Sequence, residues 1–223
     1  MSLFEARNLC KYYRLGHDHE VKALQEVSFV MARGQWLAIS GPSGSGKSTL
    51  LAILAALDRP SSGEVLFNGE NLSSANDVRL ARYRKEKIGV VFQEYQLFEE
   101  LSALENVCMP LVVSQLNRKS QRERAMMLLE RVGLADRAQH LPRQLSGGER
   151  QRAAIARALI HDPEVIFADE PTSNIDKKAA DMVMALFHSF KDQGKSLVVV
   201  SHSLELAEVA DEQLYMESGR IVS

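Results

Sequence analysis

GPSGSGKS, at residues 41–48, is the stretch of sequence that decides the fold. It fits the pattern G-x-x-x-x-G-K-S/T, follows an apolar strand predicted over 36–40 and opens a helix predicted over 47–57, which is the context this motif requires. Its glycines let the backbone turn tightly, so that successive N–H groups and the positive end of the helix dipole face one anion. The stretch therefore predicts a triphosphate site, with Lys47 at the β- and γ-phosphates and the Ser48 hydroxyl on Mg²⁺.

Two carboxylates end a second apolar run, VIFADE at 165–170. Buried acids are costly unless they are paired or bind a cation, and a Mg²⁺-bound nucleotide supplies that cation. We therefore expect Asp169 to hold Mg²⁺ and Glu170 to polarise the water that attacks the γ-phosphate. By itself an acidic strand end is equally compatible with a helix cap or a surface turn. The preceding phosphate loop favours the catalytic interpretation.

Short apolar runs alternate with helical patterns along much of the chain. This alternation predicts an α/β fold with a mostly parallel sheet, helices on both faces and ligands beyond the carboxyl ends of the strands. The predicted buried strands are 37–40, 88–92, 165–168 and 197–201. An N-terminal antiparallel β edge is predicted from 3–13, 21–31 and 64–68, and a further strand-like run covers 213–222.

Strand signals stop between residues 95 and 161, where 120–132 and 149–160 show helical periodicity. We interpret the sequence as one domain that spans 1–223, because no internal repeat or low-complexity linker divides it. Residues 95–161 are then a helical subdomain inserted into that domain, and its core comprises 1–94 and 162–223.

Charge and hydropathy limit the classes of function. Lys plus Arg number 27 and Asp plus Glu 29, a net charge of −2, which argues against a protein that mainly coats nucleic acid or an anionic membrane. The longest apolar run, Leu50–Leu57, has eight residues, far short of the roughly 20 that span a bilayer. The N-terminus carries charges where a secretory signal needs an apolar stretch, so we expect a cytoplasmic protein without direct nucleic-acid binding.

Residues 145–152, LSGGERQR, resemble the signature motif of the ATP-binding cassette (ABC) family. The resemblance covers nearly the whole chain, since Tyr13 resembles the aromatic residue that stacks on adenine, Gln93 the Q-loop, Asp176 the D-loop and His202 the switch histidine. It implies a P-loop (RecA-like) core, the ABC ATPase fold, and hydrolysis of ATP with Mg²⁺. Taken singly, each motif has a plainer interpretation: a helix N-cap for LSGGE, strand packing for Tyr13, a backbone partner for Gln93 and a core histidine for His202.

The resemblance assigns three sets of site residues. The catalytic set is Glu170, His202 and Gln93, and the Mg²⁺ set is Ser48, Gln93 and Asp169. The residues assigned to the nucleotide are Tyr13, Gly41, Pro42, Ser43, Gly44, Ser45, Gly46, Lys47, Ser48, Thr49, Ser146, Gly147, Gly148 and Asp176. In the family, the signature motif of one subunit meets the γ-phosphate held by another, which implies a head-to-tail homodimer around two ATP molecules.

Within the family, the chain looks most like the branch of the lipoprotein-release (LolD), macrolide-export (MacB) and cell-division (FtsE) ATPases. The stretches that resemble this branch are LDRPSSG at 57–63, ALENV at 103–107 and MPL at 109–111. Two positions depart from the pattern of the branch, SNID at 173–176 and Glu99, and both lie where subunit or membrane-partner contacts form. The resemblance implies a separate integral membrane permease that docks near Gln93–Pro110, and so a peripheral position on the inner face of the cell membrane. Export, lipoprotein release and mechanotransmission are the candidate roles, and the alternative is a non-transport ABC ATPase of the cell-division or nucleic-acid-associated kind.

Overall fold

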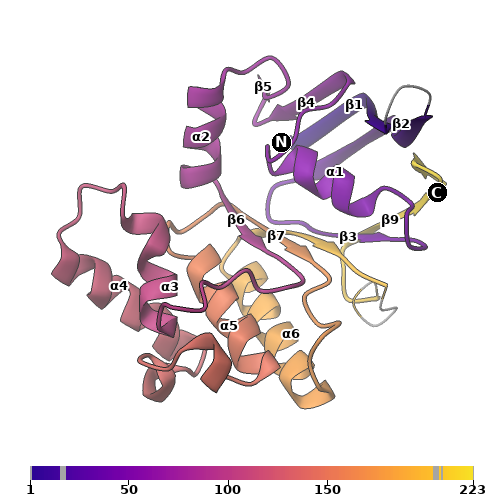
Figure 1. The fold of residues 1–223 in the computed structure, drawn as a ribbon. Helices are drawn as coiled ribbons and strands as arrows, with labels where there is room; N and C mark the ends of the chain where they lie inside the picture. Colours follow the sequence, from indigo (N-terminus) through magenta and orange to yellow (C-terminus); the bar gives the residue numbers. More distant parts are fainter. Residues whose placement is uncertain (1, 16–18, 203–205, 207, 223) are drawn as a thin grey trace.

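The main sheet of the protein has six strands in the order β10-β9-β3-β8-β7-β6 (Figure 1). The computed structural model describes residues 2–15, 19–202, 206 and 208–222. Parallel pairing joins β9 (Glu212–Glu217), β3 (Trp36–Ser40), β8 (Ser196–Val200), β7 (Val165–Asp169) and β6 (Ile88–Val91), whereas β10 (Arg220–Ile221) is antiparallel to β9. The predicted α/β fold with a mostly parallel sheet is confirmed.

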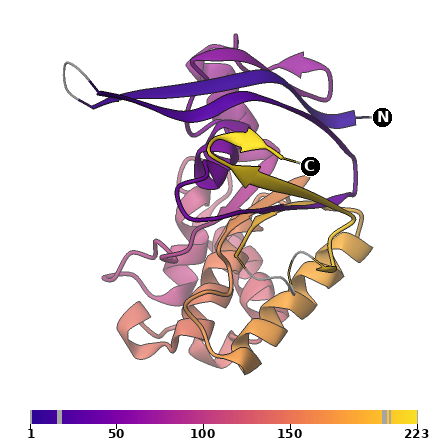
Figure 2. The same ribbon diagram turned by 90° about the vertical axis from the view of Figure 1, so that its right-hand side faces the viewer.

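The predicted N-terminal antiparallel strands form a second sheet. Its order is β2-β1-β4-β5, with β1 at Ser2–Leu15, β2 at His19–Ala32, β4 at Ser62–Phe67 and β5 at Glu70–Asn71. These strands hydrogen-bond to one another and do not extend the edge of the main sheet as the sequence suggested. Figure 2 shows the long ribbon of β1 and β2 passing across the molecule above the main sheet.

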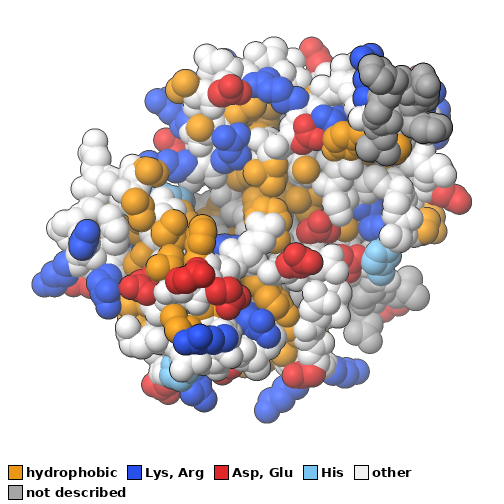
Figure 3. Space-filling view, in the orientation of Figure 1, with side chains coloured by type: hydrophobic (Ala, Val, Ile, Leu, Met, Phe, Trp, Pro, Cys, Tyr) orange, Lys and Arg blue, Asp and Glu red, His pale blue; other side chains and the backbone are white. Residues whose placement is uncertain are grey.

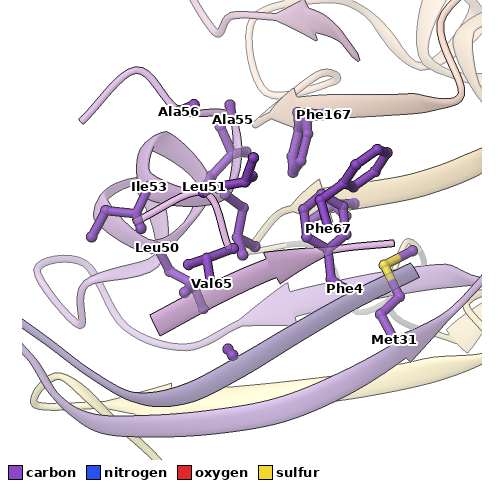
Figure 4. Close-up of a cluster of buried hydrophobic side chains, with 14 of the residues drawn as sticks. Phe4, Met31, Leu50, Leu51, Ile53, Ala55, Ala56, Val65, Phe67 and Phe167 are labelled. Carbon is purple, nitrogen blue, oxygen red and sulfur yellow. The ribbon is translucent and has the colours of Figure 1, made fainter. Parts of the chain in front are cut away.

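A cluster of aromatic and aliphatic side chains fills the space between the two sheets (Figure 4). The ring of Phe4 on β1 lies 5.1 Å from that of Phe67 on β4 and 5.8 Å from that of Phe167 on β7, measured between ring centroids. Helix α1 (Lys47–Leu54) adds Leu50 and Leu51 to the same cluster. The phosphate loop is thus anchored on one side by a buried strand and on the other by a buried helix.

Helix α1 ends three residues before the predicted end at 57. Its C-cap is Ala55, and Ala56 adopts a left-handed conformation with φ of 52°. A helix commonly ends at such a residue, and an apolar pattern that continues past it gives no sign of the break. The predicted strand over 213–222 is likewise two strands, β9 and β10, joined by a turn in which Ser218 and Gly219 both have positive φ.

The other face of the main sheet is covered by helices (Figure 1). They are α3 (Ala103–Cys108), α4 (Arg118–Arg131), α5 (Gly147–Ala158) and α6 (Lys177–Asp192), with 3-10 turns at Met109–Leu111, Ala135–Arg137 and Pro142–Gln144. A further helix, α2 (Asp77–Glu86), which the sequence analysis did not predict, buries only Leu80 and Tyr83. Among the described residues, no helix is both long and apolar enough to cross a membrane.

Candidate functional site

Three neighbouring strands, β3, β8 and β7, end at the same edge of the main sheet because they run parallel. β3 continues into residues 41–46, β7 ends at Asp169 and is followed by Glu170, and β8 is followed by Ser201 and His202. The topology therefore brings together groups that are far apart in the sequence.

Residues 41–46 form a loop that requires glycine at two points. Gly41 has φ of 139°, and a Cβ added there would lie 2.0 Å from a backbone carbonyl oxygen. Gly46 has φ of 100°, and its Cβ would lie 2.3 Å from another. Since Gly46 directly precedes α1, the loop presents the unpaired N–H groups of the helix start. The hydroxyl of Ser45 is buried there without a hydrogen-bond partner, as expected of a cradle for an anion.

The Lys47 ammonium group is buried against this loop. Nζ donates hydrogen bonds of 2.9 Å to the carbonyl oxygens of Gly41 and Pro42, and the residue is 6% exposed. Burial lowers the pKa of Lys47, while the negative charges of Glu170 and Asp169 raise it. Two neutral carbonyls are weak partners for a buried cation, so a phosphate oxygen that reached Nζ would be a stronger one.

Asp169 lies at the edge of the sheet beside α1. Burial raises the pKa of Asp169, whereas a hydrogen bond from the Ser48 hydroxyl and the charge of Lys47 lower it. Its Oδ1 is buried without a partner. A carboxylate beside a hydroxyl, with one oxygen unpaired, is a donor set that fits a hard divalent cation.

Glu170 and His202 face each other across the same edge. Nε2 of His202 lies 3.2 Å from Oε1 of Glu170, and the His202 backbone N–H donates to Oε2 at 3.4 Å. The Glu170 side chain is 10% exposed, and its Oε1 accepts no well-aligned hydrogen bond. The imidazole therefore lies within ion-pair distance of this oxygen but does not donate a hydrogen bond to it. Glu170 also has φ of 48°, a strained conformation for a residue other than glycine. Such strain is typical of functional sites.

Tyr13 lies beside the start of α1. Its hydroxyl donates to Oδ2 of Asp58 at 2.7 Å, and the hydroxyl of Thr49 is also within hydrogen-bonding reach of it. Nζ of Lys11 lies 4.9 Å from the ring centroid and 2.7 Å from Oδ1 of Asp58. Asp58 thus fixes the Tyr13 hydroxyl beside α1, the helix that follows the phosphate loop, while 38% of the residue stays exposed.

Gln93 follows β6 and is exposed. Its carbonyl oxygen accepts a hydrogen bond of 3.3 Å from Nδ2 of Asn174, and the hydroxyl of Tyr95 donates to the carbonyl oxygen of Asn174 at 3.2 Å. Asp176 caps helix α6 by accepting from the backbone N–H of Ala179 at 2.9 Å. The segment that holds Gln93 is therefore hydrogen-bonded to Asn174, which lies two residues before Asp176.

The predicted signature residues open helix α5. Ser146 is the N-cap and forms a capping box with Glu149. A Cβ added to Gly148 would lie 2.4 Å from Cβ of Ala179, so glycine lets α5 approach α6 closely. Figure 1 shows the start of α5 at the lower end of the helices, apart from the loop that joins β3 to α1. The structure does not bring Ser146 to the phosphate loop of its own chain.

A groove of about 600 Å³ lies beside the segment that follows Gln93. Figure 3 shows hydrophobic side chains gathered along this side of the molecule, and those of Val90, Phe92, Phe98 and Val113 line the groove. Its cationic lining residues are Arg84, Lys85, Arg157 and, when protonated, His161, and the described lining includes no carboxylate. We call this feature the basic groove.

Three residues that support the site were not singled out for this role from the sequence: Asp58, which holds Tyr13, Asn174, which holds Gln93, and Arg157, which contacts the segment after Gln93. Each acts on a residue at least 45 positions away. Local pattern carries no information on such contacts, so no signal in the sequence identifies them.

Comparison with known proteins gives consistent matches. The profile of the family described as "ABC transporter" matches residues 24–173. An uncharacterized ABC transporter ATP-binding protein of Thermotoga maritima is 49% identical over 98% of this chain and 93% of its own length, and one of Bacillus subtilis is 42% identical over 96% and 93%. The solved dimeric structure of MJ0796, a bacterial ABC transporter cassette, has a TM-score of 0.92 at 37% identity and covers 99% of this chain and 97% of its own. The same values hold for the structure of MJ0796 in a post-hydrolysis state with ADP and Pi.

Proposed function

The chain belongs to the ABC transporter family, and from this premise we propose that it is the ATP-hydrolysing subunit that drives a separate membrane permease. As an ABC ATPase it binds and hydrolyses ATP. The observation that carries the proposed site is the meeting of Lys47, Asp169 and Glu170 at one edge of the sheet. Each has a polar group that is buried yet weakly partnered within the chain.

The triphosphate occupies the loop over 41–46, where it accepts hydrogen bonds from the backbone N–H groups at the start of α1. Nζ of Lys47 exchanges its two carbonyl partners for phosphate oxygens. Ser48, Asp169 and Gln93 are the proposed Mg²⁺ residues, and the unpaired Oδ1 of Asp169 supports that assignment. A bound Mg²⁺ ion neutralises charge that develops on the phosphate oxygens.

Glu170 is the proposed general base for the attacking water, which it holds at the buried end of β7. His202 restrains the Glu170 carboxylate through its backbone N–H and imidazole, and it donates a hydrogen bond toward the γ-phosphate. Gln93 orients the same water from the segment that follows β6, the strand next to β7. The contribution of these groups is positioning and charge stabilisation, because phosphoryl transfer needs little covalent chemistry from the protein.

A second copy of the chain completes the site. Ser146, Gly147 and Gly148 present the start of α5 as another anion-binding helix end, but this end lies apart from the loop of its own chain. In a head-to-tail homodimer it meets the γ-phosphate on the partner, and Asp176, at the start of α6 beside it, contributes to the same interface. The dimeric state of the MJ0796 cassette supports this arrangement.

Replacing Tyr13 with alanine is expected to weaken ATP binding by about tenfold, since stacking of a base on an aromatic ring contributes roughly 1–3 kcal/mol. The neighbouring Tyr12 is the matched control, because it is similarly exposed but its hydroxyl contacts Cys10 and not Asp58. Equilibrium titration with a fluorescent ATP analogue measures both variants. Equal affinities of Tyr13→Ala and Tyr12→Ala would remove Tyr13 from the site.

The membrane partner docks in the basic groove. A permease segment that fits it presents apolar side chains to Phe98 and Val113 and a carboxylate to the cationic residues. This position overlaps the proposed docking region, Gln93–Pro110, at Gln96, Phe98 and Pro110, and the rest of the groove lining lies outside that range. The chain is then held on the cytoplasmic face of the cell membrane, and the branch resemblance favours export, lipoprotein release or mechanotransmission by the partner.

Replacing Val113 with aspartate is expected to lower recovery of the permease with the tagged chain from detergent-solubilised membranes of its own host, by about tenfold or more, because the new charge is buried at the interface. Met127→Asp on α4 is the control, since Met127 is similarly exposed but lies outside the groove. Recovery of the unaltered chain only as a free dimer would contradict transport and favour the non-transport alternative.

A further inference from the structure

One face of helix α5 lies along the segment that follows Gln93. Gly147, Arg150 and Arg157 are spaced by three and seven residues, which places them on the same side of a helix. A Cβ on Gly147 would lie 3.2 Å from the hydroxyl of Tyr95, and the Arg150 guanidinium lies 5.4 Å from the centroid of the Tyr95 ring. Gly147 and Arg150 of α5 therefore lie against the side chain of Tyr95.

Arg157 holds the backbone of the same segment. Its guanidinium donates to the carbonyl oxygen of Tyr95 at 2.8 Å and to that of Gln96. Tyr95 and Gln96 both have left-handed backbone conformations, with φ of 60° and 49°. Such a conformation is strained for a residue other than glycine unless its surroundings hold it in place. Two hydrogen bonds from one guanidinium supply that restraint.

The partners of Arg157 are unusual for a partly buried cation. Burial lowers the pKa of Arg157, which means that its surroundings disfavour the charge. Within the part of the chain that the structure describes, no carboxylate forms an ion pair with it. Arg157 also lines the basic groove, so the same side chain contacts the docking surface and the backbone beyond Gln93.

Gln93 is thus restrained on both sides. Asn174 binds its carbonyl oxygen, and Arg157 fixes the two residues at positions 95 and 96. We propose that Arg157 is a positioning residue for Gln93. This inference rests on the proposed role of Gln93 in hydrolysis.

A double-mutant cycle with Gln93 tests the proposal in the purified chain. Arg157→Met removes both hydrogen bonds while keeping the aliphatic stem, and it is expected to lower kcat about tenfold or more with KM for ATP little changed, since misplacement of a positioned group costs rate. Arg157→Lys, which retains a donor, restores part of kcat. In a Gln93→Ala background, Arg157→Met causes no further loss, because the group it positions is already absent.

Arg59→Met is the matched control. The Arg59 guanidinium also donates to two backbone carbonyls, those of Ser73 and Ala75, in a loop away from Gln93. The Arg59→Met variant is expected to keep kcat. Any small loss of kcat that it causes is expected to be independent of Gln93, so that the fold-losses of Arg59→Met and Gln93→Ala multiply in the double variant. Thermal midpoints and ATP affinities are measured for every variant, and if Arg157→Met does not fold, the cycle is run with Arg157→Lys.

Two results would overturn the inference. One is a double variant in which the fold-losses in kcat of Arg157→Met and Gln93→Ala multiply, and the other is an unchanged kcat in Arg157→Met. An unaltered chain that hydrolyses no ATP would instead overturn the proposed function. The two failures are therefore distinguishable.

Discussion

Glu170→Gln is expected to leave ATP binding intact and to lower turnover by about 10²- to 10⁴-fold, the usual contribution of a general base. Glutamine keeps the shape of the side chain and its place at the end of β7, but it accepts no proton from water. The substitution also removes a negative charge near Lys47, at the edge of the proposed triphosphate site. The closed dimer with ATP is therefore expected to accumulate.

Steady-state ATPase assays and size-exclusion chromatography with and without ATP measure the two effects of Glu170→Gln. Glu164→Gln is the control, because Glu164 directly precedes the same strand at its opposite end, where it pairs with Arg33 and Lys87. That variant is expected to keep full turnover. Normal turnover in Glu170→Gln would assign the base to another residue.

The sequence predicts the parts of the site that depend on local pattern. The loop at 41–48 and the acids at 169 and 170 each follow an apolar strand, and parallel pairing of β3, β8 and β7 is enough to place them at one edge. His202 follows for the same reason. A motif at the end of a buried strand is thus located in space as soon as the sheet is known to be parallel.

Features set by contacts between distant segments are not predicted. The separate antiparallel sheet depends on Phe4 and Phe67 packing against Phe167 of the main sheet, and a strand pattern does not show which sheet a strand joins. The early end of α1 depends on the backbone of Ala56. Arg157 is predicted only as part of a helix, because its two carbonyl partners lie about 60 residues earlier in the chain.

Ser146 has one observed role and one proposed role, and a comparison with Ser102 separates them. Within the chain, its hydroxyl accepts the backbone N–H of Glu149 at 3.2 Å and caps α5. In the proposed homodimer, the same helix end faces the γ-phosphate of the partner. Ser102 has the first role alone, since it caps α3 with the same capping box, formed with Glu105.

Ser146→Ala and Ser102→Ala are therefore expected to have similar effects on stability and different effects on activity. Each loses an N-cap, which lowers the free energy of unfolding by roughly 1 kcal/mol in denaturant titrations. Only Ser146→Ala is expected to lose ATPase activity, by about 10²-fold, because a hydroxyl that stabilises charge in the transition state is removed. ATP binding to the isolated chain stays unchanged, since Lys47 and the loop over 41–46 belong to the other half of the site. Equal ATPase rates in the two variants would show that Ser146 is only a helix cap, and the head-to-tail arrangement would lose its main support within the chain.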